Sequence, residues 1–144
     1  MKLLLDSMLG NLLTWLRLLG YDTEYWKNGD DEALIQKAIR EHRIIITRDT
    51  QLHVKAVQAG LRSVIIESPD TVSALVQVAE KIGIDVTFNP LNTRCPDCNT
   101  PLSLIEQAPN RWLCGGCGKE YWIGRHWRNI GKVLEEVSRR LKGE

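Results

Sequence analysis

The sequence predicts an α/β fold, in which a small parallel sheet has helices on both faces and is followed by a short segment that carries four cysteines. Two observations lead to the sheet. Short apolar runs alternate with longer amphipathic stretches over residues 1–90, an order that is typical of parallel strands linked by helices. The run 44–47 is apolar at every position but the last, as expected of a parallel strand that is covered on both sides.

The elements follow in chain order. We expect a strand over 2–5, then a strongly apolar helix over 8–19 that Gly20 ends. A weak strand over 23–26 precedes a helix over 32–42, whose apolar residues recur at three- and four-residue spacing. The later elements are a strand over 44–47, a helix over 50–59, a strand over 63–66, a helix that Pro69 opens and Gly83 ends, and an edge strand over 86–88.

A domain boundary is expected near residue 90, where Asn89 and Pro90 break the alternating pattern. It divides residues 1–90 from residues 91–144, and the second part ends in a helix over 130–141. Residues 1–90 hold 10 Lys/Arg against 12 Asp/Glu, a balance of −2, and residues 91–144 hold 9 against 6, a balance of +3. This asymmetry suits a protein that binds polyanions and holds cations with its acids, although chance produces the same in a near-neutral chain.

The amino terminus does not resemble a signal peptide, because Asp6 ends the apolar run that follows Lys2. No apolar stretch approaches the roughly 20 residues that cross a bilayer. We therefore expect a cytoplasmic protein that does not enter the membrane, in a compartment where thiols stay reduced.

The four cysteines are spaced as metal ligands. Cys95 and Cys98 form one pair and Cys114 and Cys117 the other, with two residues inside each pair and fifteen between the pairs, as in a four-cysteine zinc ribbon. Four thiolates close a tetrahedral shell and leave no position for a catalytic water, so the zinc is expected to be structural. Disulfides and an iron site of the rubredoxin type are the alternatives.

Three aspartates stand where strands end or helices begin. Asp6 ends the first strand, Asp31 precedes the helix over 32–42, and Asp49 follows the strand over 44–47. Because these places share one edge of a parallel sheet, we expect the three carboxylates to converge there. Together they would hold Mg²⁺ or Mn²⁺, which are hard cations that prefer oxygen ligands. The alternative is that each aspartate caps the helix that follows it.

Several longer motifs resemble the Mut-seven carboxy-terminal RNase family, and the resemblance covers nearly the whole chain. In the first part the motifs are Leu5-Asp6-x-Met8-Leu9-Gly10, residues 15–22, Asp31-Glu32-x-Leu34 and Thr47-Arg48-Asp49. Around the cysteines the matching stretches are residues 94–99 and 114–127.

The resemblance implies a PIN-like nuclease fold with a zinc ribbon behind it, and metal-dependent cleavage of RNA. By motif, Asp6, Asp31 and Asp49 are the catalytic residues that hold Mg²⁺ or Mn²⁺, and Asp30 adjoins Asp31 as a substitute in the same register. Many PIN-like proteins carry a further acid two residues after the third aspartate, where this chain has Gln51. The expected function is therefore an endoribonuclease, and the alternative is a weakly active or inactive module that binds RNA or protein.

Contacts with RNA, single-stranded or structured, are expected on both parts. Arg48 would face the scissile phosphate, and the tail offers Arg125, His126, Trp127 and Arg128. Aromatic rings stack on unpaired bases and cations contact phosphates. The tryptophans of the tail would otherwise pack the ribbon onto the first part. A phospho-receiver domain shares the alternating layout, but it needs an acidic pair where this chain has Asp6-Ser7.

Overall fold

The computed structural model describes residues 1–27, 29–68, 70–124 and 126–143. No helix within these ranges is both long and apolar enough to cross a membrane. In chain order the elements are β1 (Lys2–Leu5), the 3-10 helix η1 (Ser7–Leu9), α1 (Gly10–Leu18), β2 (Asp22–Tyr25), α2 (Asp31–Glu41), β3 (Arg43–Thr47), α3 (Thr50–Gln58), β4 (Ser63–Ile65), α4 (Thr71–Ile82), β5 (Leu102–Glu106), β6 (Arg111–Cys114), β7 (Glu120–Trp122) and α5 (His126–Leu141).

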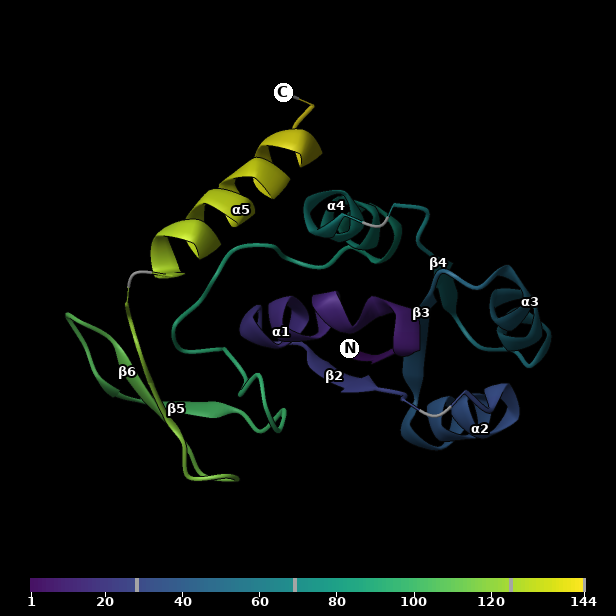
Figure 1. The fold of residues 1–144 in the computed structure, drawn as a ribbon, viewed down its shortest axis with the longest axis horizontal. Helices are drawn as coiled ribbons and strands as arrows, with labels where there is room; N and C mark the ends of the chain where they lie inside the picture. The colour runs from purple at the N-terminus through teal and green to yellow at the C-terminus, as the bar shows by residue number, and fades with distance from the viewer. Residues whose placement is uncertain (28, 69, 125, 144) are drawn as a thin grey trace.

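Strands β1 to β4 form one parallel sheet in the order β2-β1-β3-β4. The register places Leu5 of β1 between Tyr25 of β2 and Ile46 of β3. Helices cover the sheet on both sides, with α2 and α3 on one side and α1 and α4 on the other (Figure 1). The predicted α/β class is therefore confirmed.

Successive residues of β1 bury their side chains in two different cores. Leu3 and Leu5 pack with α1, α4 and α5, whereas Leu4 packs with α2 and α3. This alternation is the pleat of a strand, which sends neighbouring side chains to opposite faces. All three leucines are 0% exposed, which explains why the strand is apolar throughout.

Three expected elements differ in the structure. Residues 86–88 form no strand, because the Asp85 side chain accepts a hydrogen bond from the Thr87 N–H at 2.8 Å and curls the backbone. The expected helix over 8–19 begins as the 3-10 turn η1, and its α-helical part starts at Gly10. The final helix begins at His126, ahead of the expected residue 130.

The cysteine segment folds as an antiparallel sheet in the order β5-β6-β7. Its first cysteine turn docks on β2, an edge strand of the large sheet. The Asn99 side chain accepts a hydrogen bond from the Thr23 N–H at 3.1 Å and donates one to Asp22 at 2.7 Å. An exposed strand edge invites pairing with other chains, and this contact covers the edge of β2.

A buried arginine completes the same junction. Arg17 of α1 is 5% exposed and donates to the Thr23 carbonyl at 2.9 Å and to the Pro96 carbonyl at 2.7 Å. The close approach also requires a glycine. Gly20 has a φ of +94°, and a Cβ there would lie 2.5 Å from the Asn92 carbonyl oxygen.

Helix α5 returns to the first part of the chain and leans on α4 (Figure 1). Leu134 and Val137 are buried in the core that α1 and α4 share. At the start of α5, Trp127 packs on Phe88, with ring centroids 4.7 Å apart, and stacks on Trp112 at 5.7 Å. The division of the chain near residue 90 stays a prediction, and this packing joins the two parts of the chain through one core.

Replacing Asn99 by glycine should lower the free energy of unfolding by about 1–3 kcal/mol, because the buried Thr23 N–H loses its acceptor. Glycine retains the positive φ of 70° at this position. Asp97→Gly is the matched control in the same turn, since Asp97 is exposed, and it should cost less than about 0.5 kcal/mol. Urea unfolding of both variants measures the difference, and equal losses would contradict the role given to Asn99.

Candidate functional site

The register of the sheet brings a row of side chains together at its carboxyl edge. Asp6 continues β1, and on the alternating pattern it faces the same side as Leu4, toward α2 and α3. Trp26 continues β2, and its ring packs in the core beneath α2 and α3. Thr47 ends β3, and its hydroxyl donates a hydrogen bond to Asp6 Oδ2.

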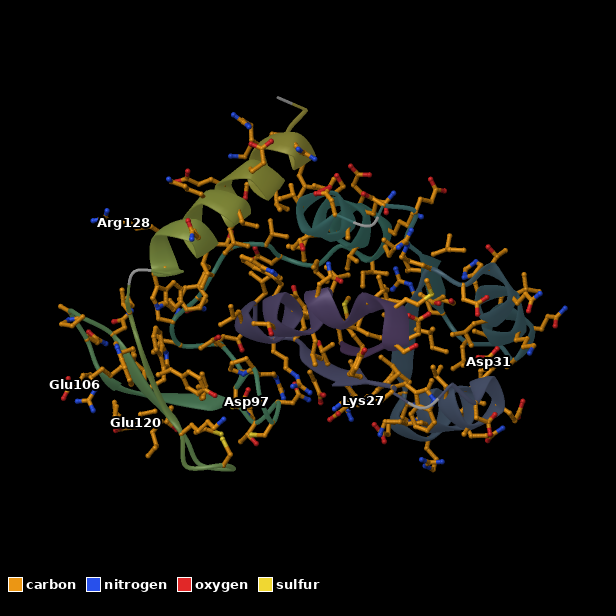
Figure 2. The ribbon with its side chains drawn as sticks, viewed as in Figure 1. Lys27, Asp31, Asp97, Glu106, Glu120 and Arg128 are labelled. Carbon is orange, nitrogen blue, oxygen red and sulfur yellow. The ribbon has the colours of Figure 1, made fainter. Side chains whose placement is uncertain are left out.

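The helices on that side bring two further carboxylates to the row. Asp31 begins α2, and Asp49 immediately precedes α3. Asp6, Asp31 and Asp49 all line one small cleft with a volume of about 120 Å³, together with Trp26 and Gly29. Figure 2 shows Asp31 between α2 and α3. Three carboxylates that are distant in the sequence thus line a single cleft.

Helix capping accounts for two of these aspartates but not for the third. Asp6 Oδ1 accepts the Met8 N–H at 3.0 Å, and Asp49 Oδ1 accepts the Gln51 N–H at 2.9 Å. Asp30, not Asp31, caps α2 by accepting the Glu32 N–H at 3.0 Å. Asp30 is exposed, whereas Asp31 lines the cleft.

The donor set has the chemistry of a site for a hard divalent cation, but its carboxylates are spaced more widely than a bound ion requires. Asp49 uses only Oδ1 for its cap, and Asp31 pairs through Oδ2 with Lys55 at 3.5 Å. That leaves one oxygen on each that accepts no hydrogen bond from the described residues. Lys55 is largely exposed, and such a surface pair is weak enough for a cation to displace it. A cleft lined by carboxylate oxygens offers the ligands that Mg²⁺ and Mn²⁺ require.

The carboxylates are not gathered as tightly as the cysteines. Within the described ranges, the cysteines are the only group of three or more acidic, histidine or cysteine side chains that is close enough to hold an ion. Like charges repel, and each aspartate has a local partner instead.

Trp26, which lines the cleft, carries a donor with no partner among the described residues. The indole nitrogen of Trp26 is buried, and it is the one buried side-chain polar atom without a hydrogen bond in the described part of the chain. Native proteins rarely leave such a donor unpaired.

The remaining predicted residues lie in different surroundings. Arg48 is half-buried between Thr47 and Asp49, and it forms no ion pair with the described residues. Arg128 projects outward from the first turn of α5 (Figure 2), whereas Trp127 is held by Trp112 and Phe88. Arg125 and the side chain of His126 lie outside the described residues.

Two neighbours of the aspartates escaped sequence reasoning: Trp26 and Lys55. Trp26 lines the cleft through strand register and Lys55 pairs with Asp31 from α3, and neither stands in one of the sequence motifs. The sequence contained one indication: Trp26 is the first residue after β2, as Asp6 is the first residue after β1.

The four cysteine sulfurs have the geometry of a metal centre. They all lie within 4.8 Å of one another, and Cys95 Sγ is 3.8 Å from Cys117 Sγ. A tetrahedral zinc with bonds of about 2.3 Å places its sulfurs about 3.8 Å apart. Gly116 lets the second turn pass close to Thr100, because a Cβ there would collide with the Thr100 hydroxyl. The cysteines are therefore arranged for a metal such as zinc.

The thiols of this centre hold their protons unequally. Hydrogen bonding to Thr100 lowers the pKa of Cys98 to about 6. The backbone of Lys119 acts to lower the pKa of Cys117, but desolvation and the neighbouring thiols outweigh it and raise that pKa to about 11. At neutral pH, Cys117 must therefore lose a proton before it can bind a metal.

Comparison with known proteins gives one match. A family model described as the Mut7-C RNAse domain matches residues 1–134. No curated protein and no solved structure matches the chain.

Zinc binding should release protons, and the affinity should fall as the pH drops from 8 toward 6, because protons compete for the thiolates. Calorimetric titration of zinc into the metal-free protein, in buffers with different ionisation enthalpies, counts the protons. Cys114→Ser should abolish stoichiometric uptake, since it removes one of four ligands. Zinc uptake that releases no proton at pH 7 would contradict the raised pKa of Cys117.

Proposed function

The chain belongs to the Mut7-C RNAse domain family, and from that membership we propose that it is a metal-dependent endoribonuclease whose catalytic centre is the carboxylate cleft. One observation carries the proposal. Carboxylates from three separate elements, Asp6 after β1, Asp31 on α2 and Asp49 before α3, line the same cleft at the carboxyl edge of a parallel sheet. Ligands of such sheets bind at this edge.

In the proposed mechanism, Asp6 and Asp49 would hold the divalent cation, and Asp31 would complete its ligands or orient the attacking water. When bound, the cation neutralises charge on the phosphate and lowers the pKa of water. Thr47 fixes the orientation of the Asp6 carboxylate through its hydroxyl. Arg48, next to Asp49, binds the phosphate of the RNA. The hydrogen bonds by which Asp49 caps α3 hold its carboxylate in place. They use one oxygen and leave the other for the cation.

Helix α5 supports a role in RNA binding for the second part of the chain. Five exposed residues, four of them in α5 and the fifth just after it, recur at spacings of four and three and so lie on one face. That face carries four cations and one acid: Arg128, Lys132, Glu135, Arg139 and Lys142. Arg128 and Lys132 have no acidic partner among the described residues, so both are available to phosphates. The half-buried Trp127 contributes to packing here, and its stacking on a base stays a prediction.

Asp49→Asn should abolish Mn²⁺-dependent cleavage of single-stranded RNA and leave the fold intact. Asparagine is as good a helix cap as aspartate, so α3 keeps its first turn while the cleft loses a charge. Asp30→Asn makes the same change at a cap outside the cleft and should leave the rate unchanged. Gel-based cleavage of a labelled RNA, with circular dichroism for the fold, measures both. Full activity of Asp49→Asn would end the proposal.

Reversing charge at Arg128 and Lys132 together should weaken RNA binding in EDTA and reduce the slope of log affinity against log salt by about 2. The matched control reverses Lys2 and Arg40, which are exposed at the opposite edge of the sheet, and should leave the slope unchanged. Fluorescence anisotropy over a range of salt concentrations measures the slopes. Equal slopes for the two double variants would exclude α5 as the RNA-binding face.

The same experiments separate the nuclease from a binding module. RNA binding in EDTA with no cleavage in Mn²⁺ would favour the module, and Gln51 in place of an acid is the feature that points to it.

A further inference from the structure

We propose that Trp26 is a positioning residue of the cleft, whose indole N–H donates a hydrogen bond to an anionic oxygen that enters or reorients when a cation and a phosphate occupy the site. The inference rests on the proposed function, because it assigns a role within the same cleft. It starts from the buried indole nitrogen, which has no partner among residues 1–27, 29–68, 70–124 and 126–143.

The position of Trp26 is fixed by the sheet. Its backbone N–H donates to the Leu5 carbonyl at 2.9 Å, which extends the pairing of β2 with β1 by one residue. That register sets Trp26 beside Asp6, and the ring packs against the core under α2 and α3, to which Leu34 and Leu52 belong. The backbone pairing with β1 and the packing of the ring on the core therefore fix the indole beside the cleft.

Packing alone does not require a nitrogen at this place. A ring of carbon atoms would fill the same core without a buried donor, which is costly when it is left unpaired. The indole nitrogen of the buried Trp112, by contrast, has a partner, because it donates to the Pro90 carbonyl at 2.9 Å. Trp26 therefore departs from the usual pattern at the cleft where a ligand is proposed to bind.

The cleft supplies the acceptors that the indole lacks. Asp6 already accepts from the Met8 N–H and the Thr47 hydroxyl. One oxygen of Asp31 and one of Asp49 accept nothing from the described residues. A cation draws carboxylates inward, and a phosphate that follows brings further oxygens. Hydrogen bonds to metal-binding carboxylates commonly strengthen metal binding, and both sources offer the same chemistry, an anionic oxygen.

The direct test is the proton spectrum of the indole groups. The chain has five tryptophans, and the signal of Trp26 is assigned as the one that Trp26→Phe removes. Mg²⁺ is titrated alone and then with uridine monophosphate, which carries a phosphate but no bond to cleave. A downfield shift of the Trp26 indole proton with Mg²⁺ alone supports a carboxylate acceptor. A shift only with the nucleotide supports a phosphate acceptor.

The second measurement is affinity. With a carboxylate acceptor, Trp26→Phe should weaken Mn²⁺ binding by about tenfold to a hundredfold. With a phosphate acceptor, the loss should fall on nucleotide affinity instead. Trp15→Phe is the matched control, because Trp15 packs on the opposite face of the sheet, and it should change neither constant. If Trp26→Phe fails to fold, the titration of the unmodified protein still decides, with the signal assigned through its contacts to the core under α2 and α3.

An indole signal that moves with neither ligand, while Mn²⁺ binds, overturns the proposal. This outcome is separate from failure of the proposed function. A protein that binds Mn²⁺ and loses cleavage in Asp49→Asn, but has an unmoved Trp26 signal, keeps the function and loses only this inference. Full activity of Asp49→Asn removes the function and this inference with it.

Discussion

The parallel register of β1 between β2 and β3 is the constraint on which the rest of the structure depends. It fixes which residues stand side by side where the strands end: Trp26, Asp6 and Thr47. A slip of one residue in any strand would turn its side chain to the other face. The leucines of β1 prevent that slip, because Leu4 belongs to one core and Leu3 and Leu5 to the other. The hydrophobic cores therefore hold the register, and the register builds the cleft.

The cysteine segment stabilises the same sheet by packing on its edge. Asn99 lies between Cys98 and Thr100, so the turn that presents its amide to Thr23 is the turn that a metal bound by the cysteines would organise. Burial acts to raise the pKa of Asp22, but hydrogen bonds from Arg43 and Asn99 outweigh it and hold that pKa below its ordinary value. This junction covers the outward N–H and carbonyl groups of Thr23. The same turn therefore joins the candidate metal site to the edge of the large sheet.

The cleft differs from the rest of the molecule in its polar groups. Among the described residues, the other buried side-chain donors and acceptors are paired, as the contacts of Arg17 and Asn99 illustrate. At the cleft, like charges lie near one another and no acceptor for the Trp26 indole is found among these residues. Departures of this kind are expected where a protein is built to bind something, because the ligand supplies the missing partner. The division of labour between Asp30, which caps α2, and Asp31, which lines the cleft, fits the same account.

By itself, the sequence determined the alternation of strands and helices, the zinc-binding arrangement of the cysteines and the placement of Asp6, Asp31 and Asp49 at one edge. These follow from local patterns: apolar periodicity, fixed ligand spacing, and the common edge of parallel strands. The expected strand over 86–88 was wrong, because a single side-chain contact from Asp85 outweighed its β-forming residues. Only the tertiary structure decided that Asp30 caps α2, that Trp26 and Thr47 flank Asp6, and that Asn99 seals the edge of β2. Each of these depends on which residues meet across separate elements, and that is fixed by register and packing rather than by any local stretch of sequence.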